Sequence, residues 1–253
     1  MDARRLPARH GVLWLLGGFA LFRRHPPLLT ALTFGYLLAL IVVNLIPTIG
    51  PFLWPLLLPT LSVMLGNGCR AVERGQFFSS ETLGTGIGAQ RVGLLRLGGL
   101  HLFGSSLLVL AAGAILGEPI NLADGLDPAE AMALAGDFAV IFLLASPLLL
   151  AFWFAPLLTA WDGVSAGKSL FFSLVACVRN WRAFTLYGLT LILDGAVLPG
   201  LILFIAGTLS QSLFAVLSVA LRMLLIFVLA PTMVASIYMS YCSVFAAAAG
   251  SDE

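Results

Sequence analysis

Hydrophobic positions in this chain form long uncharged runs that are separated by short charged segments. The run at 26–69 contains no charged residue and is divided by the sequence IPTIGP at 46–51. About 20 consecutive apolar residues are enough to cross a bilayer as an α-helix. The pattern therefore predicts an all-α integral membrane protein with about six transmembrane helices, at roughly 28–46, 52–69, 94–116, 138–160, 183–207 and 212–240.

The composition identifies the surroundings of these helices. Of the 253 residues, 60% are hydrophobic and 10% are charged, whereas a soluble domain carries about 25% charged residues. A surface with so little polar cover would aggregate in water, so lipid must cover most of it.

The distribution of charge predicts the orientation. If both termini are cytoplasmic, twelve of the thirteen Lys and Arg residues fall on the inner side and none on the outer side, with Arg222 inside the membrane. The five carboxylates of 117–137 then fall outside. We predict one transmembrane domain, 1–253, that has a cytoplasmic or interfacial N-terminal segment (1–27), an acidic extracytoplasmic loop (117–137) and a C-terminal tail (246–253).

Short sequence similarities suggest that the chain is built from repeats. The spans that return inward contain LLLPTLSVM (56–64), WFAPLLTAW (153–161) and VLAPTMVAS (228–236), and arginine precedes each outward span. We interpret these as three helix-pair repeats, each beginning with an interfacial segment. The first such segment, GVLWLLGGFALF (11–22), is expected to lie in the inner interface with Trp14 at head-group level.

Two charged residues fall within the last pair of spans. If the turn of that pair is centred near Thr208, Asp194 and Arg222 each lie fourteen residues from it and therefore at similar depth. We expect an intramembrane ion pair between Asp194 and Arg222, because each charge would replace water for the other. The alternatives are that Arg222 reaches an interface, or that it serves a separate ligand or partner.

Other polar residues define weaker candidate sites. His101, among glycines in the third span, could ligate a haem or a chlorophyll-type magnesium, although a packing role is the alternative. A basic collar for lipid head groups is formed by arginines that also orient the protein, namely Arg23, Arg24, Arg91, Arg179 and Arg182. No catalytic constellation and no metal-ligand spacing is visible, so we expect no catalytic residues, no metal and no cofactor.

Three blocks of sequence resemble a known family. LPARHGVLWLLGGFALFRRHPPLL (6–29), NGCRAVERG (67–75) and FWFAPLLTAWDGVSAGKSLFFSLVACVRNWRAF (152–184) are similar to a family of uncharacterised multi-pass inner-membrane proteins of proteobacteria, especially beta-proteobacteria. This resemblance implies a bacterial inner-membrane location and no transferable activity. The helix pattern is also distantly similar to the membrane domain of some glycerophosphodiester phosphodiesterases, whose catalytic domain this chain lacks.

These observations together favour a role without catalysis. We expect an accessory or scaffold subunit of a membrane complex, or a lipid-organising protein. Its partners would be membrane lipids, anionic ones among them, and other membrane subunits or further copies of the chain, but not nucleic acid. The alternative is a small permease or transporter of lipids or other amphiphiles that uses the Asp194–Arg222 region. Pigment or haem binding through His101 is a third possibility.

Overall fold

The computed structural model describes residues 3–116 and 128–245, and within these ranges it contains helices and turns. The helices are α1 (His10–Arg24), α2 (Pro26–Asn44), α3 (Gly50–Arg74), α4 (Ser80–Leu83), α5 (Arg91–Leu116), α6 (Pro128–Asp162), α7 (Ala166–Arg179), α8 (Trp181–Ile192), α9 (Leu198–Leu209), α10 (Gln211–Leu224) and α11 (Ala230–Phe245). Two π-helical segments join α8 to α9 and α10 to α11, namely η2 (Leu193–Val197) and η3 (Leu225–Leu229).

Six helical segments in the described ranges are long and apolar enough to cross a membrane. They are Pro26–Asn44, Gly50–Arg74, Arg91–Leu116, Gly136–Asp162, Trp181–Leu209 and Gln211–Phe245. This result confirms the six predicted spans. One boundary was wrong, because α6 begins at Pro128, where proline suits a first helical turn, and so the segment 128–137 is helical rather than loop. The rest of the predicted acidic loop, 117–127, lies outside the described residues, as does the predicted tail, 246–253.

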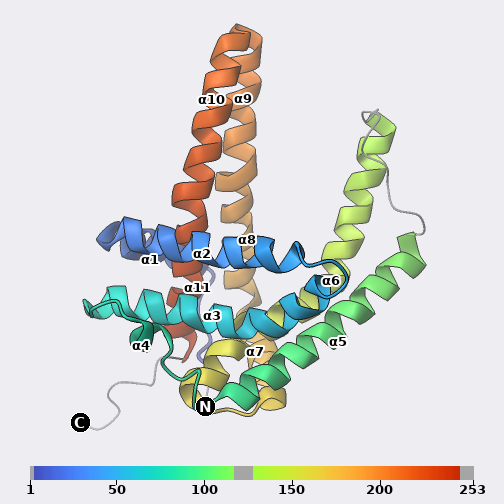
Figure 1. Cartoon of the computed structure of the whole chain (residues 1–253). Helices are drawn as coiled ribbons and strands as arrows, with labels where there is room; N and C mark the ends of the chain where they lie inside the picture. Colours follow the sequence, from blue (N-terminus) through green and yellow to red (C-terminus); the bar gives the residue numbers. More distant parts are fainter. Residues whose placement is uncertain (1–2, 117–127, 246–253) are drawn as a thin grey trace.

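The spans form three hairpins that diverge from a shared base (Figure 1). They are α2–α3, α5–α6, and the long pair made by α8–α9 and α10–α11. Each hairpin follows a shorter helix, which is α1, α4 and α7 respectively. The order of elements agrees with three helix pairs, while a repeat in the sequence itself stays a prediction.

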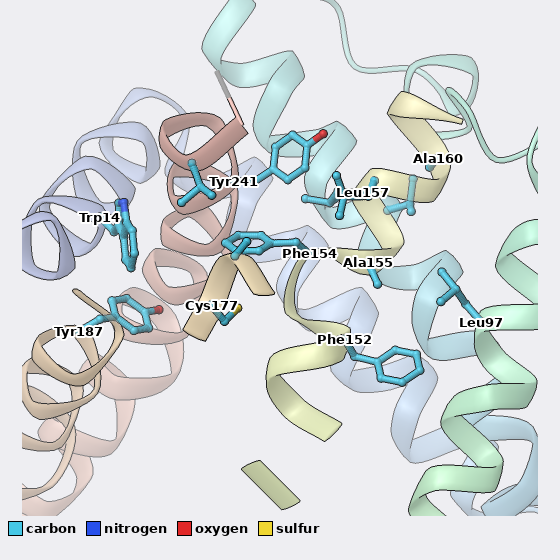
Figure 2. Close-up of a cluster of buried hydrophobic side chains, with 14 of the residues drawn as sticks. Trp14, Leu97, Phe152, Phe154, Ala155, Leu157, Ala160, Cys177, Tyr187 and Tyr241 are labelled. Atoms are coloured by element: carbon cyan, nitrogen blue, oxygen red, sulfur yellow. The ribbon is translucent and has the colours of Figure 1, made fainter. Parts of the chain in front are cut away.

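The buried core lies in the base, where helices from all three hairpins meet around α6. Phe154, Leu158 and Leu97 are fully buried there, and Figure 2 shows Phe154 of α6 beside Tyr241 of α11. Trp14 is 2% exposed, and its Nε1 donates a hydrogen bond to Ser243 Oγ at 2.7 Å. Trp14 is therefore covered by protein, because α1 packs this face against α8 and α11, and its depth at the level of the head groups stays a prediction.

A serine of α7 forms hydrogen bonds with the backbone of α6 in the core. Pro156 lies inside α6 and removes one backbone donor from that helix. Nearby, the Phe154 N–H donates to Ser173 Oγ at 2.9 Å, and the same hydroxyl donates to the Leu150 carbonyl at 2.8 Å. Ser173 is fully buried, so it joins α7 to α6 through the backbone groups of Phe154 and Leu150.

Candidate functional site

A basic pocket lies at the corner between α7 and α8, at the base of the molecule. Its volume is about 350 Å³. It is lined by Arg5, Leu6, Pro7, Ala8, Arg179, Asn180, Trp181 and Arg182. One wall is therefore the extended N-terminal segment, and the other is the end of α7 with the first turn of α8.

Asn180 fixes the N-terminal segment over this corner. It is 1% exposed, and its Oδ1 accepts a hydrogen bond from the Leu6 N–H at 2.8 Å. Its Nδ2 donates to the Arg4 carbonyl and to the Ala176 carbonyl, each at 2.9 Å. A fourth bond, from the Arg4 N–H to the Val244 carbonyl at 3.0 Å, attaches the same segment to the end of α11. We call residues 4–8 the N-terminal strap.

The pocket has the chemistry of an anion site. Arg5, Arg179 and Arg182 contribute three guanidinium groups, and no carboxylate is among the lining residues. Helix α8 begins at Trp181, and the backbone N–H groups of its first turn add partial positive charge there. Guanidinium groups bind phosphate oxygens through paired hydrogen bonds, so the arrangement suits a phosphate group.

The predicted basic collar divides into separate places. Arg179 and Arg182 come together in the basic pocket, but Arg23, Arg24 and Arg91 are not among its lining residues. The Arg23 guanidinium lies 5.9 Å from the ring of Phe19, Arg24 Nη1 donates to the Glu73 carbonyl at 3.3 Å, and Arg91 begins α5. Arg5 was missed, and its position in a basic run before α1 was the signal available in the sequence.

The last hairpin places Asp194 and Arg222 differently from the prediction. The turn lies at Ser210, which has extended backbone and separates α9 from α10. Asp194 is then sixteen residues from the turn and Arg222 is twelve, an offset of four residues or about 6 Å along the helices. The predicted equal depth was therefore wrong. Arg222 is exposed on α10, whereas Asp194 is half-buried in a pocket that Arg222 does not line, so the structure does not bring the two groups together.

Comparison with known proteins identifies the family. A curated protein of Burkholderia thailandensis, described as a probable inner membrane protein, is 38% identical to this chain over 207 residues. The aligned region covers 75% of this chain and 74% of that protein.

The chain belongs to this family of inner-membrane proteins. With six spans, it is a multi-pass protein of the inner membrane. No protein-family profile matches the chain, and no solved structure matches it. The helix-pattern similarity to the membrane domain of glycerophosphodiester phosphodiesterases stays a prediction.

In this inner-membrane protein, two tyrosines of α11 join that helix to α3 and α6 through hydrogen bonds to carboxylates that were not predicted from the sequence. Tyr238 Oη donates to the carboxylate of Glu73 on α3, and Tyr241 Oη donates to that of Asp162 at the end of α6. Hydrogen bonds to an ionised acceptor are about twice as strong as neutral ones. The signal in the sequence was the presence of two acids among the basic residues of the inner side.

A second polar contact joins α3 to α6 beside these tyrosines. The Arg70 guanidinium lies 3.4 Å from the centre of the Trp161 ring, which is a close cation–π contact. Trp161 Nε1 donates to Asn67 Oδ1 at 2.8 Å, and Asn67 Nδ2 donates to the carbonyls of Leu83, at the end of α4, and of Thr85 in the following loop. These contacts give Arg70 a structural role in the base.

His101 lies in a packed helix contact. Its ring meets Phe152 of α6 edge to face, with 4.7 Å between ring centres. A Cβ added at Gly98 would come within 2.5 Å of the Leu56 carbonyl oxygen, and one at Gly104 within 2.7 Å of a Leu148 methyl. These glycines therefore allow α5 to approach its neighbours. Pigment or haem binding at His101 stays a prediction.

Proposed function

We propose that this inner-membrane protein is a non-enzymatic accessory subunit that joins another membrane protein through its α9–α10 hairpin. The observation that carries the proposal is the position of Arg222. It lies twelve residues from the hairpin tip at Ser210, or about 18 Å along the helix, inside a hydrocarbon core of about 30 Å. Its side chain is exposed, and the hairpin extends away from the other helices (Figure 1).

An exposed guanidinium at this depth favours a protein partner over lipid. An arginine at the centre of a transmembrane helix costs about 2.5–3.5 kcal/mol on insertion. The distance of about 18 Å to the tip is too long for the side chain to place its head group in the outer interface. A carboxylate on a neighbouring helix would offset this cost through a bidentate, charge-assisted contact.

The face around Arg222 suits helix packing. Val219 and Met223 flank it, with exposed fractions of 55% and 44%. α10 packs on α9 along one side, and no residue of α10 is buried in the described structure. A partner helix that lies on this face would cover apolar side chains and pair with Arg222 at the same time.

The test is site-specific photo-crosslinking from position 219 in intact cells. We expect a protein adduct whose yield falls at least tenfold in Arg222→Gln and is largely kept in Arg222→Lys, because lysine retains the charge. Arg96→Gln, which removes an exposed arginine from the base end of α5, serves as the matched control. Crosslinks to lipid alone, or a protein adduct that Arg222→Gln leaves unchanged, would refute the proposal.

A second role, the organisation of anionic lipid, is supported by the basic pocket. A lipid phosphate that bound Arg5, Arg179 and Arg182 would hold its head group at the cytoplasmic end of α8 under the predicted orientation. Native mass spectrometry should show bound phosphatidylglycerol or cardiolipin that is lost in Arg179→Gln/Arg182→Gln. An equal loss in Arg91→Gln, or equal binding of phosphatidylcholine, would show that the basic pocket is not the site.

A further inference from the structure

A second pocket, of about 400 Å³, lies where α1 crosses the long hairpin. This volume falls within the range of small-ligand sites. Its walls are mainly apolar, with Leu16 and Phe19 of α1, Ile202 of α9, Leu224 of α10 and Val228 of η3. Only Asp194 and Thr232 bring polar side chains to it. We call it the hairpin pocket.

The two polar side chains of the hairpin pocket are poorly satisfied within the chain. Thr232 is 3% exposed, and its Oγ1 has no hydrogen-bond partner in the described structure. Asp194 is half-buried among leucines and other apolar side chains. A buried hydroxyl without a partner costs about 1–3 kcal/mol. The Thr232 hydroxyl oxygen is sealed from the pocket, so the group that a ligand can reach is the Asp194 carboxylate, and a cationic ligand would gain by pairing with it.

The backbone is irregular at this level on both sides of the hairpin. The π-helical segments η2 and η3 lie 13–17 residues before and 15–19 residues after the turn at Ser210, so they face each other across the hairpin. A Cβ at Gly195 would lie 3.4 Å from a methyl of Leu229, which shows that the two segments are in contact. Single π-helical turns are frequent at functional sites.

The hairpin pocket lies near the boundary between hydrocarbon and head groups. About 20 helical residues cross the hydrocarbon, and counting from the tip at Ser210 places its far edge at roughly residues 190 and 230. Asp194 and Thr232 therefore lie close to this edge, while Ile202 and Leu224 lie deeper. A bound amphiphile would have its polar group at the carboxylate and its chain along the apolar walls.

We propose that the hairpin pocket binds an amphiphile that carries a primary ammonium group, the chemistry of an aminophospholipid head. The ammonium donates hydrogen bonds to the Asp194 carboxylate, which it neutralises. One alkyl chain lies along Ile202 and Leu224. The proposal depends on neither partner docking nor the basic pocket, because the two pockets share no lining residue and Arg222 does not line the hairpin pocket.

The test uses the full chain in liposomes with a photoactivatable phosphatidylethanolamine as probe. Unlabelled phosphatidylethanolamine should compete at least tenfold better than phosphatidylcholine, whose methylated head cannot donate hydrogen bonds. Competition by dodecylamine as well would support binding of any primary-ammonium amphiphile, whereas competition by phosphatidylethanolamine alone would identify the lipid as the ligand. Equal competition by phosphatidylcholine would overturn the proposal.

Variants locate the site. Asp194→Asn should reduce labelling about tenfold, and Ile202→Trp should block the pocket. Arg96→Gln, which removes an exposed arginine that lines neither pocket, should label as the wild type does. Unchanged labelling in Asp194→Asn, for protein that elutes and melts as the wild type does, would overturn the proposal even if Ile202→Trp fails to fold.

Discussion

Asn180 holds the N-terminal strap, and replacing it with alanine should release that segment without unfolding the helices. Two of its three hydrogen bonds join it to the strap, at the Leu6 N–H and the Arg4 carbonyl. A typical hydrogen bond contributes about 0.5–1.5 kcal/mol net, so together they stabilise the closed strap by about 1–3 kcal/mol. Because each 1.4 kcal/mol is tenfold, the opening equilibrium should rise by about 5- to 150-fold.

Hydrogen exchange of the Leu6 amide measures this opening directly. In the wild type this N–H is bonded to Asn180 Oδ1, so it exchanges through strap opening. The control is Asn44→Ala, since Asn44 Nδ2 bonds only to a carbonyl of its own helix and is exposed. If the Leu6 amide exchanges in Asn180→Ala within about twofold of its rate in the control, the strap is held by something else and the reasoning fails.

Three further predictions follow from the core and its contacts. Ser173→Ala should lower the free energy of unfolding by about 1–3 kcal/mol, because two hydrogen bonds between α7 and the backbone of α6 are lost in the core. Thermal melts in detergent against Ser218→Ala, which loses only a bond within its own helix, would show it. Gly18→Ala should cost about 1–3 kcal/mol, because the new Cβ would lie 2.6 Å from a backbone oxygen of α11, while Gly35→Ala, which meets nothing within 4 Å, should not destabilise in the same melts. Burial raises the pKa of the Cys177 thiol to about 12, so it stays a thiol at pH 8, and mass spectrometry should find it unmodified by maleimide until the protein unfolds.

The sequence predicted those features whose cause is local. Apolar runs fix the spans, because each helix must satisfy its backbone within itself in lipid. The depth of Asp194 relative to Arg222 depends on where one turn falls, and the glycine of the segment GTLSQS, Gly207, lies three residues before the turn at Ser210. A displacement of two residues in the turn changes the offset of the two charges by four residues, which is enough to separate them.

The basic pocket and the buried side of α1 depend on contacts between distant parts of the chain. Arg5 and Arg179 are 174 residues apart and meet only because Asn180 accepts the strap. The rule that tryptophan prefers the membrane interface predicted contact between Trp14 and lipid head groups, whereas the Trp14 side chain is buried among the helices. The spacing of Gly11 and Gly18 on either side of it was the available signal, because both glycines touch neighbouring backbone and mark the packed face of α1.

Because the long hairpin extends away from the base, we expect substitutions at Arg222 and in the basic pocket to act independently of each other. Arg222 lies on α10, whereas Arg179 and Arg182 lie at the corner of α7 and α8, and changes at distant sites without shared partners usually add. Combining Arg222→Gln with Arg179→Gln/Arg182→Gln should therefore reduce the crosslink from position 219 and the retained anionic lipid by the same factors as each change does alone. If Arg222→Gln by itself removed the lipid from the purified protein, the lipid would be held at the partner interface rather than by the basic pocket, and the two proposed roles would reduce to one.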